Sequence, residues 1–282
     1  MKEVYIKARA KINLNLEILD KREDNYHNIK SVFQKINLYD EMYLEKSNFN
    51  KFELQTNIES LNNEQNIVYN TYVKLKDNYK NITGVKVILN KKIPMEAGLA
   101  GGSTDCASFI LGMKKLFDLN MSKEKIFSIA KELGADVVPC LYNRAVLAEG
   151  IGDEITTINT SLKYYIVIVK PGFSCNTKEM YKKMDEINKK CYLDTTDKII
   201  SGLENNNLNL IASNLHNMFE DVLQETEIIK KDFLNNGALG SLLSGSGSCV
   251  YGIFENKQIA KQAYNKLKEK YQTYICTSSK KE

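Results

Sequence analysis

A glycine-rich stretch with the sequence PMEAGLAGGSTDCAS, residues 94–108, is the segment whose composition suggests chemistry. Glycines let a backbone approach a ligand closely, and backbone amides at a helix start attract an anion such as a phosphate. A Walker A loop has a lysine directly after its last glycine, but Gly102 is followed by serine and threonine. A dinucleotide-binding loop spaces its first two glycines two apart, whereas Gly98 and Gly101 are three apart. The stretch therefore matches neither of these motifs.

Two charged residues could act on a phosphate held by such a loop. Phosphoryl transfer needs anchored phosphates, a cation against developing charge, and a carboxylate near the attacking hydroxyl group. Lys11 can supply the positive charge, and Asp136 can accept or orient the hydroxyl proton. Each feature also has an ordinary explanation: Lys11 as a solvated strand residue, Asp136 as a turn residue, and the loop as a helix cap. The residues by themselves leave both explanations open.

The elements on either side of the loop form a unit that could bind an anion or could simply be a helix with a glycine-rich cap. Upstream, the apolar residues Val85, Val87 and Leu89 recur at every second position against the polar Lys86 and Asn90. This period predicts a half-buried strand, which Pro94 closes. Downstream, apolar residues at helical spacing from Ile110 to Phe117 predict a helix. Its capping candidates are Ser103, Thr104 and Asp105. The predicted unit is a strand, a glycine loop and a helix whose N-terminal dipole attracts anions.

Further elements are predicted along the chain. Strict alternation over residues 11–18 predicts a strand from which Lys11 and Asn13 project together. Residues 122–133 predict a helix that is capped by Ser122 and ended by Gly134, with Asp136 just beyond it. The apolar run YYIVIV from Tyr164 predicts a buried strand that opens a second domain. A second glycine-serine loop, a helix over residues 258–271 and a short last strand follow.

Composition limits the possible functions. The chain has 282 residues, of which 43% are hydrophobic, so it can bury a sizeable core. Its net charge of +4 comes from 39 basic and 35 acidic residues that are interspersed, which favours small-molecule chemistry over nucleic-acid binding. The six cysteines form no CxxC pair, which favours a reducing compartment over a zinc site or a disulfide framework. With neither a signal-peptide core nor a membrane-spanning run, we expect a cytoplasmic protein that does not bind membranes.

Three motifs in order along the chain resemble the signature regions of the GHMP kinase superfamily. They are PMEAGLAGGST at 94–104, GAD at 134–136 and GALGSLLSGSGSCVYGIF at 237–254. Within that superfamily, residues 8–41 and the stretch KPGFSCNTKEMY at 170–181 look like the 4-diphosphocytidyl-2-C-methyl-D-erythritol (CDP-methylerythritol) kinases of the non-mevalonate isoprenoid pathway. The resemblance implies an α+β fold with a ribosomal-S5-like N-terminal domain and a ferredoxin-like C-terminal domain. We expect these domains at residues 1–160 and 161–282.

The resemblance also implies roles for individual residues. Lys11 and Asp136 would be the catalytic pair, and the loop that binds the phosphates of ATP would comprise Pro94, Met95, Glu96, Ala97, Gly98, Leu99, Ala100, Gly101, Gly102, Ser103 and Thr104. The contacts to the substrate, CDP-methylerythritol, would come from Asn13, Tyr26, His27, Thr177 and Tyr181, with Tyr26 stacked on the cytosine. For Tyr181, plain core packing is an equal alternative. Mg²⁺ is implied by the use of ATP, and Ser103 is the candidate for its contact.

Two other functions remain open at this stage. Another GHMP kinase, of the homoserine or mevalonate type, would share the loop and Asp136 but not the Tyr26–His27 pair. A non-catalytic nucleotide-binding sensor of the same fold is the second alternative, although the presence of both Lys11 and Asp136 argues against it. Ala100 stands where many loops of the superfamily have glycine, and we expect it to keep a negative φ. The sequence is compatible with a monomer or a homodimer.

Overall fold

The computed structural model describes residues 1–187 and 194–279, and the chain divides into two compact units. Unit 1 comprises Met1–Ala10, Tyr39–Ile93 and Ala100–Leu141; unit 2 comprises Lys11–Leu38, Pro94–Leu99 and the chain from Tyr142 onward. The units interleave along the sequence because two long strands, β1 (Glu3–Lys21) and β2 (His27–Ser47), each contribute to both. The predicted domain boundary after residue 160 lies inside unit 2, between two strands. A division of the chain into two domains at this residue therefore stays a prediction.

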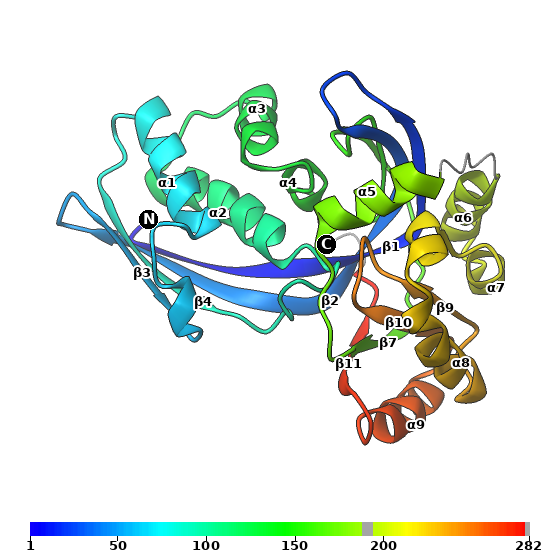
Figure 1. Ribbon diagram of the computed structural model, residues 1–282. Helices are drawn as coiled ribbons and strands as arrows, with labels where there is room; N and C mark the ends of the chain where they lie inside the picture. Colours follow the sequence, from blue (N-terminus) through cyan, green and yellow to red (C-terminus); the bar gives the residue numbers. More distant parts are fainter. Residues whose placement is uncertain (188–193, 280–282) are drawn as a thin grey trace. The chain divides into compact units, whose positions relative to one another are not determined.

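Unit 1 is a sheet with helices on one face (Figure 1). Besides its parts of β1 and β2 it contains β3 (Phe52–Thr56), β4 (Gly84–Asn90), the 3-10 helix η1 (Glu59–Leu61), and the helices α1 (Ile67–Asn78), α2 (Gly101–Phe117), α3 (Lys123–Leu133) and α4 (Val137–Cys140). Strand β4 pairs antiparallel with β2 and parallel with β3. Helix α2 lies close to the sheet because Gly112 has no side chain, and a Cβ atom there would overlap Ile6 and Leu44.

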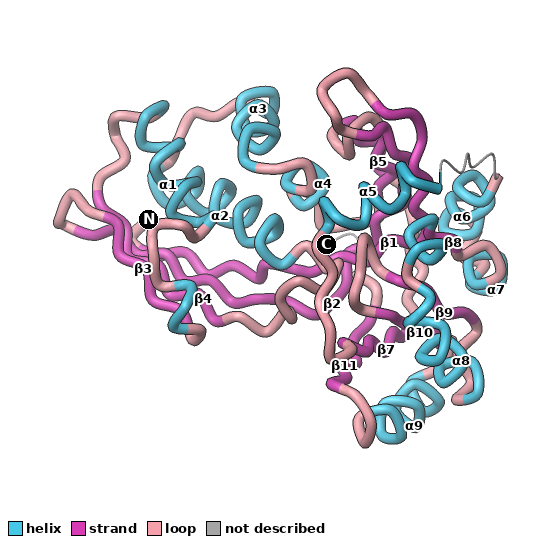
Figure 2. Tube along the Cα trace, in the orientation of Figure 1, coloured by secondary structure: helices cyan, strands magenta, loops and turns pink. Residues whose placement is uncertain are grey.

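Unit 2 contains two groups of strands. In the first, β5 (Val146–Glu149) pairs antiparallel with β2 and with β6 (Glu154–Thr157), and the short β8 (His216–Asn217) pairs parallel with β1. The second is an antiparallel sheet with the order β11-β7-β10-β9, formed by β7 (Tyr165–Lys170), β9 (Gly240–Leu243), β10 (Val250–Phe254) and β11 (Gln272–Thr277). Figure 2 shows these strands in magenta with cyan helices against them.

The helices of unit 2 complete a ferredoxin-like arrangement. They are α5 (Thr177–Ile187), α6 (Thr195–Glu204), α7 (Leu208–Ala212), η2 (Met218–Val222), η3 (Gln224–Thr226), α8 (Glu227–Asn235) and α9 (Lys257–Leu267). Helix α8 precedes the β9–β10 pair and packs on it, and α9 connects β10 to β11. Numbered in chain order, the four strands of the sheet lie in the order 4-1-3-2, which confirms the fold predicted for the C-terminal part.

Most of the predicted elements form where periodicity placed them. Strand β4 covers the predicted residues 85–89, and β7 contains the predicted apolar run except its first residue, Tyr164. Helix α3 begins after Ser122, whose Oγ accepts the N–H of Lys125 at 3.2 Å, and it ends at Gly134. The expected alternation in β1 is also present, but its polar face is buried, with Lys11 and Asn13 only 3% and 0% exposed.

The start of α2 differs from the prediction in two respects. The helix begins at Gly101, so the predicted capping residues 103–105 lie within its first turns and do not cap it. Ala100 is the N-cap residue and has a φ of 55°, in the left-handed region, whereas we expected a negative φ. Its carbonyl oxygen accepts the N–H of Thr104 at 2.9 Å, so this backbone conformation allows the helix to begin directly after the loop.

Two further sequence expectations concern cysteines and membranes. The five cysteines in the described part of the chain form no disulfide bond, and Cys191 lies outside the described residues. Among the helices of residues 1–187 and 194–279, none has both the length and the apolar character needed to cross a membrane.

Candidate active site

Lys11 is a buried cation with a fixed orientation in unit 2. Its Nζ donates to Asn13 Oδ1 at 2.7 Å and lies 4.6 Å from the centroid of the Phe33 ring. The side chain of Asn13 is held in turn, because its Nδ2 donates to Ser31 Oγ at 2.7 Å. The lysine and asparagine that the sequence places on one face of a strand are therefore in contact, and a neighbouring strand supports them.

The two glycine-rich loops of unit 2 meet beside this lysine. Ser244 Oγ donates to the carbonyl oxygen of Gly98 at 3.0 Å, and the N–H of Cys249 donates to the carbonyl oxygen of Ala97 at 3.3 Å. A Cβ atom added to Gly245 would lie 3.4 Å from Lys11 Nζ. The structure thus brings the Lys11 ammonium group to the place where the first and second glycine motifs touch.

Two side chains of the first loop are buried, whereas Met95 and Glu96 are exposed. Ala97 and Leu99 are buried, so these residues can offer a ligand only their backbone. In unit 1, Gly102 is exposed in the first turn of α2, and Thr104 Oγ1 donates to the carbonyl oxygen of Arg9 at 2.7 Å. The first amides of a helix have no intrahelical acceptor, so the start of α2 can bind an anion through N–H groups and the Ser103 hydroxyl group.

Asp136 lies in unit 1, directly after the end of α3. It is the N-cap residue of the short α4, yet its carboxylate makes no capping hydrogen bond to that helix. The side chain is half-buried, which limits its conformational freedom. Asp136 therefore occupies a defined turn position, in agreement with the placement expected from the sequence.

His27 forms the centre of a second group of predicted residues in unit 2. Its Nε2 lies 2.7 Å from Asp185 Oδ1, and its ring is stacked on Tyr181 with the centroids 5.0 Å apart and the planes 13° from parallel. Lys21 Nζ donates to the other oxygen of Asp185 at 2.6 Å, and this hydrogen bond lowers the pKa of the Asp185 carboxyl group. Tyr26, next to His27, leaves 56% of its surface exposed.

One face of α5 supplies the partners of this group. Thr177, Tyr181 and Asp185 are spaced four residues apart, so they share a face of the helix. Thr177 Oγ1 lies 2.8 Å from Ser246 Oγ in the second glycine loop, and Tyr181 packs edge-on against Phe219. Tyr181 therefore packs on the core and also contacts His27, while its contact with the substrate stays a prediction.

Some residues of these networks were not identified from the sequence. Asp185 and Lys21 hold His27 in unit 2, and the four-residue spacing from Tyr181 was the available signal for Asp185. In unit 1, Asp40, Lys91 and Asp105 form a buried ion cluster. Of these three residues, the sequence indicated only Asp105, as a candidate helix cap. No local pattern marks such a cluster, because its members come from distant parts of the chain.

We expect Gly98→Ala to destabilise unit 2. Gly98 has a φ of 70°, and a Cβ atom there would overlap the backbone carbonyl group of Ser244. Backbone strain of this kind costs about 1–3 kcal/mol, so the free energy of unfolding measured in urea should fall by at least that amount. The matched control is Gly172→Ala, because nothing lies within 4 Å of a Cβ atom at Gly172. Equal stabilities of the two variants would contradict the contact between the loops.

Comparison with known proteins identifies the family. Residues 66–144 match the family described as "GHMP kinases N terminal domain", and residues 199–273 match "GHMP kinases C terminal". Over 271 residues the chain is 39% identical to a 4-diphosphocytidyl-2-C-methyl-D-erythritol kinase of Clostridium botulinum (strain Eklund 17B / Type B), covering 94% of this chain and 96% of that one. The chain belongs to the GHMP kinases, which are ATP-dependent small-molecule kinases.

Further relatives agree with this assignment. The chain is 41% identical over 280 residues to the 4-diphosphocytidyl-2-C-methyl-D-erythritol kinase of Thermoanaerobacter pseudethanolicus, covering 96% of this chain and 94% of that one. A crystal structure of 4-(cytidine 5'-diphospho)-2C-methyl-D-erythritol kinase superposes with a TM-score of 0.83 at 25% identity, covering 99% of this chain and 100% of the other. Homoserine kinase from Cytophaga hutchinsonii matches with a TM-score of 0.75 at 18% identity, over 99% of this chain and 95% of that one, which shows a shared fold.

Proposed function

We propose that this protein transfers the γ-phosphoryl group of ATP to the 2-hydroxyl group of 4-diphosphocytidyl-2-C-methyl-D-erythritol. The observation that carries the proposal is the similarity, at 39% and 41% identity over more than nine-tenths of the chain, to kinases of that name. Homoserine and mevalonate kinases resemble the chain at 18% identity or less, which supports the fold and not their substrates. Their substrates are therefore the alternatives to be tested.

In the proposed reaction, Lys11 stabilises negative charge and Asp136 receives or orients the proton of the attacking hydroxyl group. A buried ammonium group that is already held by Asn13 needs little reorganisation when charge develops on the phosphoryl oxygens. A carboxylate at a defined turn position can accept or orient a substrate proton. The amides of the loop from Pro94 to Thr104 would anchor the phosphates of ATP.

The cytidine part of the substrate would lie at the His27 group. The exposed ring of Tyr26 can stack on a cytosine, while His27 and Tyr181 offer an imidazole edge and a second aromatic surface. Asn13 and Thr177 would add polar contacts to the remainder of the substrate. The stacked pair and its Asp185 support are the structural features that favour a base-containing substrate.

Mg²⁺ would accompany ATP. The ion prefers oxygen ligands, keeps several water molecules and is typically held by nucleotide phosphates with few protein groups. Among residues 1–187 and 194–279 no group of three His, Cys, Asp or Glu side chains could hold a metal ion. Ser103 would contribute its hydroxyl oxygen, and the ion would neutralise phosphate charge.

A substrate panel tests the proposal. The purified protein is incubated with ATP, Mg²⁺ and one acceptor at a time: CDP-methylerythritol, mevalonate, homoserine or galactose. We expect ADP release with the first acceptor and none above background with the others. Turnover of another acceptor alone would assign a different GHMP kinase activity, and ATP binding without turnover of any acceptor would favour a nucleotide sensor.

Tyr26→Ala tests the cytidine contact within that assay. Loss of an aromatic ring that stacks on a base costs about 1–3 kcal/mol, so kcat/KM for CDP-methylerythritol should fall about tenfold to a hundredfold. The KM for ATP should not change, because Tyr26 is proposed to contact only the acceptor. Tyr43→Ala is the control, since Tyr43 is an exposed tyrosine of unit 1 with 53% of its surface accessible. Normal acceptor kinetics in Tyr26→Ala would remove the stacking role.

A further inference from the structure

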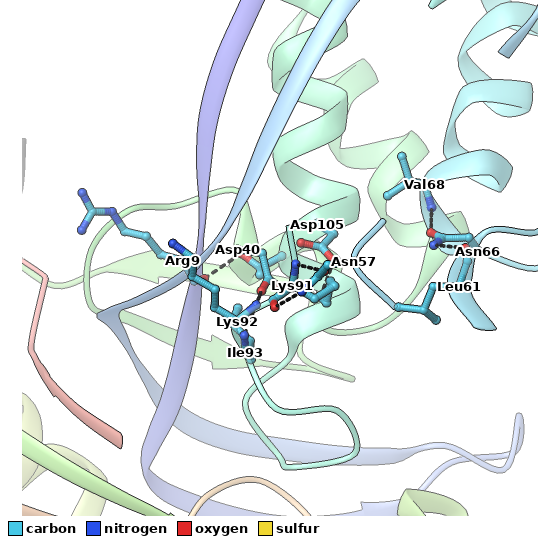
Figure 3. Close-up of polar contacts among 11 residues, drawn as sticks. Arg9, Asp40, Asn57, Leu61, Asn66, Val68, Lys91, Lys92, Ile93 and Asp105 are labelled. Carbon is cyan, nitrogen blue, oxygen red and sulfur yellow. Dashed lines mark hydrogen bonds and ion pairs between the residues drawn. The ribbon is translucent and has the colours of Figure 1, made fainter. Parts of the chain in front are cut away.

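Unit 1 contains a buried cluster of one cation and two carboxylates beneath the start of α2 (Figure 3). Lys91 Nζ lies 2.5 Å from Asp40 Oδ2 and 2.5 Å from Asp105 Oδ2. The three residues come from the end of β4, from β2 and from α2, and they are 9%, 0% and 2% exposed, respectively. One lysine cannot neutralise two ionised carboxylates, so a net negative charge would be buried unless one of them holds a proton.

The hydrogen bonds of the two carboxylates are unequal. Asp40 Oδ1 accepts the backbone N–H groups of Lys92 at 2.5 Å and Ile93 at 2.8 Å, in addition to the contact of its Oδ2 with Lys91. Asp105 Oδ1 is buried and has no hydrogen-bond partner within the described part of the chain. An ionised carboxylate is stabilised by several donors and penalised by an unpaired buried oxygen. The geometry therefore places the negative charge on Asp40 and the proton on Asp105.

The electrostatic environment of Asp105 leads to the same assignment. The pKa of Asp105 is raised to about 8: burial raises it most, the ammonium group of Lys91 opposes that rise, and the negative charge of Asp40 adds to it. Lys92 interacts electrostatically with Asp40, and two thiols lie near Asp105. Burial raises the pKa of the Cys106 thiol to about 12, and Cys140 on α4 lies near that thiol. The buried, unpaired Oδ1 of Asp105 and this raised pKa both favour the protonated form near neutral pH.

Asp105 lies one helical turn from the first residue of α2. The first residue of α2 is Gly101. A Cβ atom added to Gly101 would lie 3.5 Å from Lys91 Nζ, so the backbone at the start of the helix is close to the same lysine. A helix N-terminus carries about half a positive elementary charge, which a nearby carboxylate neutralises. An ionised Asp105 would thus compete with any anion for the positive end of α2, whereas a neutral Asp105 would not.

We propose that Asp105 is a positioning residue for the nucleotide: held neutral, it joins Lys91 in fixing the start of α2 and leaves the positive helix end available to the phosphates of ATP. This inference rests on the proposed function, because it needs ATP to bind at this loop. Its consequence is a linkage between proton and nucleotide. Below the pKa of Asp105 the protonated site binds ATP tightly; as the pH rises through that pKa, the carboxylate ionises and ATP affinity falls. Reciprocally, bound ATP favours proton uptake by Asp105.

The test is equilibrium binding of ATP, measured by calorimetry with excess Mg²⁺ and no acceptor. For the unchanged protein we expect the dissociation constant to rise about threefold to tenfold between pH 7 and pH 9.5, the size of charge effects at helix ends. Asp105→Asn mimics the neutral acid, so it should bind ATP at pH 7 within about twofold of the unchanged protein and lose that rise. Asp118→Asn, at the exposed C-terminal end of the same helix, should keep the original pH profile.

A second measurement does not depend on any variant. If ATP raises the proton affinity of Asp105, binding near pH 8 takes up protons, and the observed enthalpy changes with the ionisation enthalpy of the buffer. Uptake in the unchanged protein and its loss in Asp105→Asn would support the inference. Tight ATP binding with the same pH profile and proton count in both proteins would overturn the inference alone. The absence of any ATP binding would overturn the proposed function together with it.

Discussion

Asp136→Asn is expected to lower kcat for CDP-methylerythritol by about 10²–10⁴-fold, the usual contribution of a positioned general base. Asparagine keeps the size of the side chain but cannot accept a proton at neutral pH. Because Asp136 is proposed to act on the acceptor hydroxyl group, the KM for ATP should stay within about twofold, so that the loss appears in kcat. Steady-state kinetics with each substrate varied in turn provide the measurement.

The control for this variant is Asp118→Asn in the same unit. Asp118 is exposed and has a φ of 53°, a conformation that asparagine adopts readily, so both activity and fold should be retained. Thermal unfolding of both variants shows whether either change disturbs unit 1. If Asp136→Asn keeps near-normal kcat in a folded protein, Asp136 is a turn residue without a catalytic role.

Lys11→Met is expected to lower kcat by about 10²–10³-fold, since removing one preorganised group that stabilises transition-state charge has this effect. The fold should survive, because methionine fills a similar apolar volume beside Phe33 and removes the cost of burying a charge. Loss of the ammonium group leaves Asn13 Oδ1 without its donor, a local cost of about 1–3 kcal/mol. Activity and urea unfolding of the same preparation separate the two effects.

Lys7→Met is a matched control for Lys11→Met. Lys7 lies on the same strand, and its ammonium group is 4.7 Å from the centroid of the Tyr39 ring, a geometry close to that of Lys11 and Phe33. Lys7 is exposed and lies four residues before Lys11 on β1, so its loss should leave kcat unchanged. Equal activity of the two variants would return Lys11 to the role of an ordinary strand residue.

The sequence by itself determined the local elements and the motifs that they carry. Helix α3 with its Ser122 cap and Gly134 end, the strand before the glycine loop, and the buried strand β7 all follow from periodicity and turn chemistry within short windows. The same local alternation placed Lys11 and Asn13 side by side on β1. The three ordered motifs also indicated the kinase family, which the comparisons confirm.

Only the tertiary structure decided which polar side chains are buried together. Alternation in β1 could not reveal that its polar face is buried, because that burial depends on Ser31 in β2 and on Thr196, which donates to Glu17 Oε1 at 2.6 Å across 179 residues of sequence. In the same way, Asp185 reaches His27 across 158 residues, and Asp105 meets Asp40 through Lys91. Short-range patterns encode the conformation of a segment, whereas the charge state of Asp105 and the orientation of His27 arise from side chains that folding brings together.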